Sequence, residues 1–220
     1  MKTTLNLKHS VGLKTMNWLK GIKVTPKTGD EILTNEGISI NYSLLDFWKW
    51  SVSDILSNAT RGRFAEFIVC TAIGLNPDKI RNEWEAYDLT TSEGIKIEIK
   101  SAAYIQSWAQ KSFSDIRFSI KKSRYWEAET NILNRESKRH ADVYVFCHLK
   151  HKDINTINPL KMEQWDFYIL PTSILDNYKD NQISISIKSL QKLANPRKYS
   201  ELSTEILKAY EKQNKLNHSK

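Results

Sequence analysis

The clearest pattern in the chain is a strict alternation of isoleucines with charged residues, in the run Ile95-Lys96-Ile97-Glu98-Ile99-Lys100. Because a β-strand repeats every two residues, the isoleucines face a core, while Glu98 and Lys100 share the other face about 7 Å apart. A second short strand precedes this run, with a tight turn between the two. The pattern therefore predicts a β-hairpin formed by Glu85–Thr90 and Ile95–Ser101.

Apolar residues that recur every three or four positions predict helices on both sides of this hairpin. The first carries a stripe of Leu45, Trp48, Val52 and Leu56, and the second is apolar almost all round after Arg63, so it should be buried. The expected helical segments are Leu44–Ser57, Arg61–Ile73 ended by Gly74, a short turn opening at Asn76-Pro77, and Ser200–Gln213.

Four further patterns concern strands and their arrangement. Asp115–Ile120 alternates and should be a third strand in the same sheet as Glu98 and Lys100. Ala141–His148 is almost wholly apolar, which is typical of a central strand covered on both faces. Two later strands are expected at Trp165–Leu170 and Ile183–Ile187. Strands that alternate with helices predict an α/β sandwich with a mixed sheet.

Composition narrows the class of protein. The chain has 220 residues, a hydrophobic fraction of 40% and a formal net charge of +8. This length suits one domain with extensions, and we divide it into an amino-terminal extension (1–42), a core domain (43–194) and a carboxy-terminal helix and tail (195–220). The positive charge favours a polyanionic partner such as nucleic acid.

The cysteines and the apolar runs indicate the compartment. Cys70 and Cys147 both lie in apolar runs, which is typical of buried free thiols in a reducing environment. The longest apolar run is shorter than the roughly 20 residues that cross a bilayer, and the amino terminus lacks an apolar signal core. We therefore expect a cytoplasmic protein without a membrane partner.

Carboxylates and an ammonium group converge in the predicted hairpin. The fold-back of the strands brings Asp88 beside Glu98 and Lys100, which suits magnesium-dependent hydrolysis of phosphodiester bonds. Mg²⁺ prefers hard oxygen ligands, and Mn²⁺ is expected to substitute for it. Lys100 would orient or deprotonate the attacking water, or stabilise developing charge. The alternative is a solvated strand face with an ordinary glutamate–lysine pair.

Asp88 followed by Glu98-Ile99-Lys100 resembles the PD-(D/E)xK nuclease superfamily, which contains many restriction endonucleases and DNA repair nucleases; the resemblance covers roughly residues 44–149. It implies a restriction-endonuclease-like three-layer α/β sandwich with a mixed central sheet flanked by helices, and a DNA endonuclease of restriction or repair type. The family's proline is absent before Asp88. Pro77-Asp78 supplies that pair literally, but Asp78 opens a helical turn, where an acid favours the helix dipole without catalytic duty.

The resemblance also implies further site residues. The carbonyl of Ile99 would be another metal ligand, and Glu66, the acid of the second helix, would complete the metal site. A salt bridge to Arg63 is the alternative for Glu66. Gln106 would orient water or phosphate, the alternative being an ordinary surface glutamine.

A basic and aromatic segment spans residues 111–139. Its cations can hold phosphates and its rings can pack against bases or sugars, so the predicted nucleic-acid-binding residues are Lys121, Lys122, Arg124, Tyr125 and Trp126. An ordinary basic loop between two strands is the alternative. A non-catalytic nucleic-acid-binding module and an RNA-processing nuclease also stay open, as does a homodimer.

Overall fold

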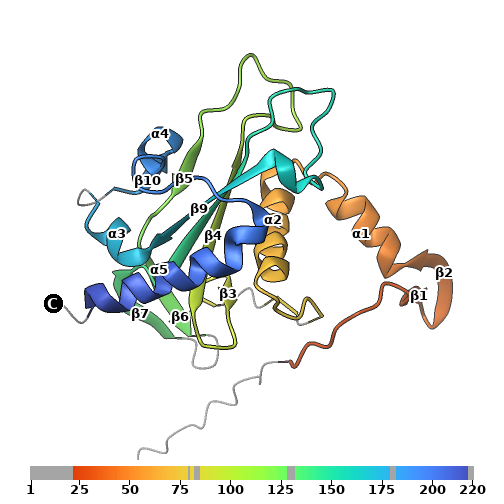
Figure 1. Cartoon of the computed structure of the whole chain (residues 1–220). Coiled ribbons are helices and arrows are strands. Elements are labelled where there is room, and N and C mark those ends of the chain that lie inside the picture. The colour runs from red at the N-terminus through yellow and green to blue at the C-terminus, as the bar shows by residue number, and fades with distance from the viewer. Residues whose placement is uncertain (1–21, 79, 82–84, 128–131, 179–181, 218–220) are drawn as a thin grey trace, which may run out of the picture.

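The computed structural model describes residues 22–217 except for 79, 82–84, 128–131 and 179–181. Its centre is a four-stranded sheet (Figure 1), in which β3 pairs antiparallel with β4, β4 pairs parallel with β8, and β8 pairs antiparallel with β9. The predicted mixed sheet is therefore confirmed. The strands are β3 (Leu89–Thr90), β4 (Lys96–Ala103), β8 (Val143–Leu149) and β9 (Trp165–Pro171).

β8 is the central strand that its sequence predicts, and all seven of its residues are buried. The first strand of the predicted hairpin is much shorter than expected, because β3 keeps only two residues. The expected strand at 183–187 likewise reduces to the three residues of β10 (Ser184–Ser186).

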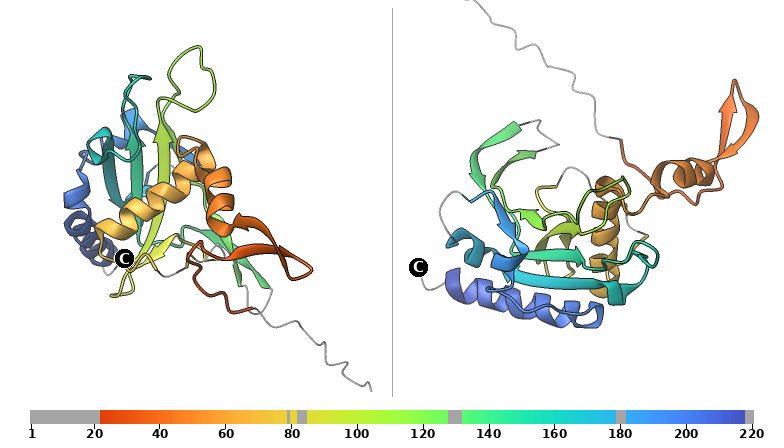
Figure 2. Two further views of the ribbon diagram at one scale, coloured as in Figure 1. Left: turned by 90° about the vertical axis from the view of Figure 1, so that its right-hand side faces the viewer. Right: turned by 90° about the horizontal axis from the view of Figure 1, so that it is seen from above.

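Two helices cover one face of the sheet, α2 (Asn58–Ala72) and α5 (Leu202–Asn217). The isoleucines of the alternating run point to this face and pack in one core with Val69 and Ile206. Figure 2 shows α5 lying along the sheet on this side. The expectation that α2 is buried all round is wrong: Ala65, Ile68 and Val69 face the core, whereas Phe67 is 51% exposed.

The other face is covered by small elements: β5 (Arg117–Ser119), β10, α3 (Thr172–Asp176) and α4 (Ile187–Leu190). β5 pairs with β10 in a separate two-stranded sheet. The prediction that this strand joins the sheet of Glu98 is therefore wrong. Its alternation was interpreted correctly, since Ile116, Phe118 and Ile120 are all buried, but they pack across the main sheet rather than extend it.

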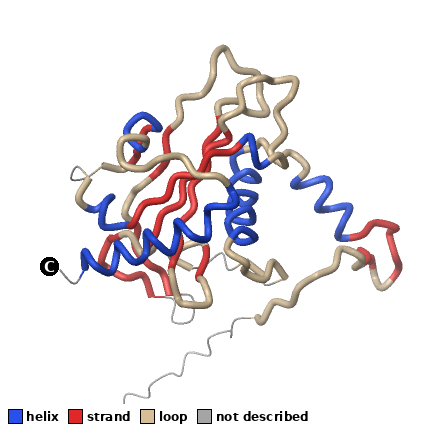
Figure 3. Tube along the Cα trace, viewed as in Figure 1, coloured by secondary structure: helices blue, strands red, loops and turns tan. Residues whose placement is uncertain are grey.

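The basic segment contains a second hairpin, formed by β6 (Ser123–Glu127) and β7 (Ile132–Lys138), so the interpretation as a loop is wrong. Its two strands, coloured red like all strands in Figure 3, form a two-stranded sheet of their own. Arg139 anchors its base: Nε donates to the carbonyl of Ile120 at 2.9 Å, and Nη1 lies 2.6 Å from Asp176 Oδ1. The Arg139 side chain is only 4% exposed, so these contacts join the base of the hairpin to the body away from solvent.

An amino-terminal arm stands away from the body (Figures 1 and 2); it comprises β1 (Ile32–Asn35), β2 (Ile38–Ser43) and α1 (Leu44–Val52). The helix ends at Val52 rather than at the predicted Ser57, and no residue of α1 is buried. Of the predicted apolar stripe, only Leu56, which lies beyond the helix, packs against the core. The helix packs instead on the segment before β1. There, Gly29 has φ +98°, and a Cβ would lie 3.0 Å from the Trp48 ring, so a glycine suits this position.

The carboxy-terminal helix belongs to the main body, because Leu202, Ile206 and Ala209 complete the core beneath β8 and β9. Two single turns of 3₁₀ helix, Met162–Gln164 and Tyr199–Glu201, precede β9 and α5. Both cysteines are free, and only Cys147 is fully buried; Cys70 is half-buried, contrary to expectation. Among the described residues, no helix has the length and apolar character that a membrane crossing needs.

Candidate active site

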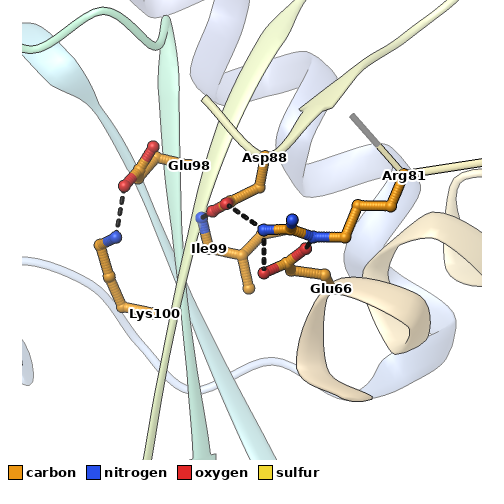
Figure 4. Close-up of polar contacts among 6 residues, drawn as sticks. All are labelled: Glu66, Arg81, Asp88, Glu98, Ile99 and Lys100. Carbon is orange, nitrogen blue, oxygen red and sulfur yellow. Dashed lines mark hydrogen bonds and ion pairs between the residues drawn. The ribbon is translucent and has the colours of Figure 1, made fainter. Parts of the chain in front are cut away.

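Glu98 and Lys100 lie on one face of β4, as their spacing predicts, and the Lys100 ammonium group donates to Glu98 Oε1 (Figure 4). Their side chains are 17% and 30% exposed. This pair alone would fit an ordinary structural ion pair. Whether the pair can be part of a catalytic site depends on the side chains around it.

Asp88 lies just before β3 and caps the edge of β4. Its Oδ2 accepts a hydrogen bond from the N–H of Ile99 at 2.7 Å. Because β3 pairs only with Ile97 and Lys96, Ile99 lies beyond the paired stretch, and the Asp88 carboxylate takes the place of a neighbouring strand. In a strand, the N–H and C=O of one residue face the same neighbour. The Ile99 carbonyl therefore lies on the edge of β4 that Asp88 caps.

Glu66 reaches the same place from the middle of α2, and it meets Arg81. The Arg81 guanidinium donates twice to Glu66, from Nε to Oε2 and from Nη2 to Oε1, the latter at 3.1 Å. Nη2 also lies 3.7 Å from Asp88 Oδ1. Figure 4 shows Asp88 between this pair and the Glu98–Lys100 pair. Sequence reasoning missed Arg81, because an arginine in a polar connecting segment gives no signal of its position.

The pKa of Asp88 reflects its burial and its acidic neighbours. Burial raises the pKa of Asp88 to about 7, and the negative charges of Glu98 and Glu66 contribute to the rise. The Ile99 N–H and the Lys100 charge act in the opposite direction. Three carboxylates thus share one partly buried region. In the described parts of the chain, however, no three acidic, histidine or cysteine side chains are grouped closely enough to hold an ion as they stand.

Asp88→Asn is expected to stabilise the metal-free protein at pH 8, by up to roughly 4 kcal/mol. The folded protein keeps the Asp88 proton up to about pH 7, whereas the unfolded chain loses it near the ordinary value of 3.8. Ionisation therefore favours the unfolded chain as the pH rises from about 4 to about 7. The gain in the free energy of unfolding of Asp88→Asn over the wild type should be complete at pH 8 and absent below pH 4. Urea unfolding in EDTA measures it.

The control is Asp78→Asn, because Asp78 is exposed on the turn after α2. This change should leave stability unaltered at both pH values. A loss of stability in Asp88→Asn at pH 8 would show that the carboxylate is held mainly by attraction to Arg81.

The surroundings of Gln106 match neither a residue that orients water or phosphate nor an ordinary surface glutamine. It is buried, so the surface alternative is wrong. Its Oε1 accepts from Arg61 Nη1 at 3.0 Å, and its Nε2 donates to the Ala103 carbonyl at 2.9 Å and to Ser114 Oγ at 3.2 Å. These bonds tie the start of α2 to the loop after β4. The arrangement describes a structural tie, and we assign no catalytic step to Gln106.

The predicted basic residues adjoin the Glu98–Lys100 pair. A groove of about 560 Å³ lies between β4 and the base of the second hairpin, lined by Glu98, Lys100, Lys121, Lys122 and Arg124 with three serines. Tyr125 lines a different cavity, on the other side of the hairpin. Trp126 is half-buried and stands opposite Leu133 in the hairpin register. The structure thus brings the proposed catalytic pair and three of the five proposed binding residues to one groove.

Comparison with known families supplies an independent finding. The sequence model of the family described as bacteriophage T4 endonuclease IV matches residues 13–188. The chain belongs to the bacteriophage T4 endonuclease IV family. The matched range includes every candidate site residue and ends before α5. A search of curated proteins finds no match. Membership of an endonuclease family agrees with the nuclease function that the sequence predicts.

Proposed function

We propose that this protein is a magnesium-dependent endonuclease that hydrolyses phosphodiester bonds in DNA at the edge of β4. The observation that carries the proposal is the Asp88 carboxylate bonded to the Ile99 N–H, within the motif Glu98-Ile99-Lys100 and beside a cationic groove. Membership of the endonuclease family supports the same reaction class. The restriction or repair role that the superfamily resemblance implies stays a prediction.

The donor atoms at this edge suit magnesium. Carboxylates of Asp88, Glu98 and Glu66 and the carbonyl of Ile99 are all hard oxygen ligands. The Arg81 guanidinium is a cation that already bridges two of these acids. A bound Mg²⁺ ion would stabilise charge on the scissile phosphate and lower the pKa of an attacking water. Because Arg81 and the ion compete for Glu66 and Asp88, we expect Arg81 to leave them when the metal binds.

Side chains of the protein would supply the other parts of catalysis and substrate binding. Lys100 is held beside Glu98, so its ammonium group can orient the attacking water or stabilise charge that develops on the phosphate. Lys121, Lys122 and Arg124 line the same groove and would hold the flanking phosphates. The Asp88–Ile99 bond fixes the edge of β4 and thereby the direction of both side chains on its face.

Purified protein incubated with plasmid, linear duplex, single strands and RNA tests this proposal. We expect DNA to be cut with Mg²⁺ or Mn²⁺, and EDTA to abolish the cutting. Closed circular plasmid distinguishes an endonuclease from an exonuclease, since it offers no ends. Cleavage of RNA alone would favour the RNA-processing alternative, and binding without cleavage under every condition would favour the non-catalytic module.

A further inference from the structure

A second cavity, of about 530 Å³, lies on the other side of the β6–β7 hairpin from the cationic groove. Lys96 of β4 lines it, whereas Glu98 and Lys100 line the groove. Lys96 and Glu98 are two residues apart on one strand, so they share a face at a spacing of about 7 Å. The spacing of about 7 Å between Lys96 and Glu98 equals about two nucleotide steps, because successive nucleotides of a duplex strand are 3.4 Å apart along the helix axis. The cavity therefore adjoins the proposed site of cleavage.

The groove and the cavity differ in the charge of the side chains that line them. The groove has four cationic side chains against the single carboxylate of Glu98, which suits a phosphate backbone. The cavity has three of each sign. Its cations are Lys96, Lys138 and Arg139, and its acids are Glu85, Asp142 and Asp176. Arg139 and Asp176 form an ion pair at 2.6 Å. A balanced lining attracts a neutral group rather than a phosphate.

The cavity also offers aromatic faces and polar groups. The rings of Tyr125 and His140 lie 6.1 Å apart at 49°, and Tyr87 lies on the same lining. His140 Nε2 is 2.9 Å from the carbonyl of Ser123, which fixes the ring against the hairpin. Aromatic faces stack on bases, while side-chain amides such as that of Asn134 bond to base edges.

We propose that this cavity binds one nucleobase of the nucleic-acid strand, extruded beside the phosphate that is cut. The inference rests on the proposed function and adds to it a site for sequence preference. The neutral lining accepts the base, while the cationic groove holds the backbone on the other side of the hairpin. Extrusion from a duplex costs a few kcal/mol of stacking and pairing.

Two variants test the cavity in cleavage reactions on a DNA library with random sequence, followed by sequencing of the new ends. The wild type should prefer certain bases next to the cut. Tyr125→Ala, which removes an aromatic wall, and Ala86→Phe, which fills the cavity, should each reduce that preference about tenfold. Tyr42→Ala on exposed β2 is the matched control and should keep it. Unchanged preference in both cavity variants would overturn the proposal.

A binding measurement separates this inference from the proposed function. 2-Aminopurine is placed at each position of a duplex in turn and titrated with protein in Ca²⁺, without cleavage. The wild type should change its fluorescence at least about twofold at one position, and Ala86→Phe should not. If one duplex position gave this change but the protein never cut DNA, the base site would be supported and the endonuclease function refuted. Normal cutting without any such position would refute the base site alone.

Discussion

Glu98→Gln is expected to lower the rate of DNA cleavage at least about 1000-fold. The substitution keeps the size of the side chain but removes a charge that lies beside Lys100 and close to Asp88. A metal contributes several kcal/mol to transition-state stabilisation, and each 1.36 kcal/mol corresponds to tenfold in rate. The measurement is single-turnover cleavage of supercoiled plasmid in Mg²⁺. DNA binding should stay largely intact, because phosphate contacts elsewhere supply most of the affinity.

The chain offers a matched control for this substitution. Glu136 and Lys138 form the same glutamate–lysine pair, two residues apart on β7, with Nζ and Oε2 separated by 3.2 Å. Both side chains are more than half exposed. Glu136→Gln should therefore leave cleavage within about twofold of the wild type, since exposed pairs contribute little. Undiminished cleavage by Glu98→Gln would show that the activity lies elsewhere on the protein.

Replacing Lys121, Lys122 and Arg124 together with alanine is expected to weaken DNA binding and to flatten its salt dependence. Each lost phosphate contact lowers the slope of log affinity against log salt by about 0.9, so the slope should fall by up to about 2.7. The three residues line the groove beside Glu98, at the base of the hairpin that Arg139 joins to the body. The measurement is a fluorescence titration at several salt concentrations, in Ca²⁺ to suppress cutting.

A second triple variant controls for net charge. Lys208, Lys212 and Lys215 are exposed on α5, which covers the opposite face of the sheet. Their replacement with alanine removes the same charge and should leave the slope nearly unchanged. Equal slopes in the wild type and the groove variant would mean that the hairpin base is only a solvated connection.

Short-range periodicity predicted the parts of the site that lie on one strand. The face shared by Glu98 and Lys100 follows from alternation alone, and the buried run 141–148 became the central strand. Gly74, with φ +70°, follows α2 where its sequence predicts an end. These features depend on residues that are close together in the chain, so the periodicity of the sequence is enough to predict them.

Long-range pairing lay beyond the same reasoning. Phe118 alternates as in any strand, but nothing in its pattern says that β10 rather than β4 pairs with it. Trp48 belongs to a stripe that resembles a core face, yet it packs on the segment at Gly29. Gln106 and Arg81 find partners 45 and 15 residues away. A periodic pattern shows that a side chain needs a partner, and only the folded chain shows which partner it takes.

The most direct test of the proposed metal site is a titration of the protein with Mn²⁺, followed by electron paramagnetic resonance of the free ion. We expect the wild type to bind Mn²⁺, and Asp88→Asn and Glu98→Gln each to bind it at least about tenfold more weakly, since each loses an oxygen ligand charge. Arg81→Gln should bind it about fivefold more tightly, because a competing ion pair of roughly 1 kcal/mol is lost. Equal affinity in the wild type and both acid variants would contradict a metal centre at the edge of β4.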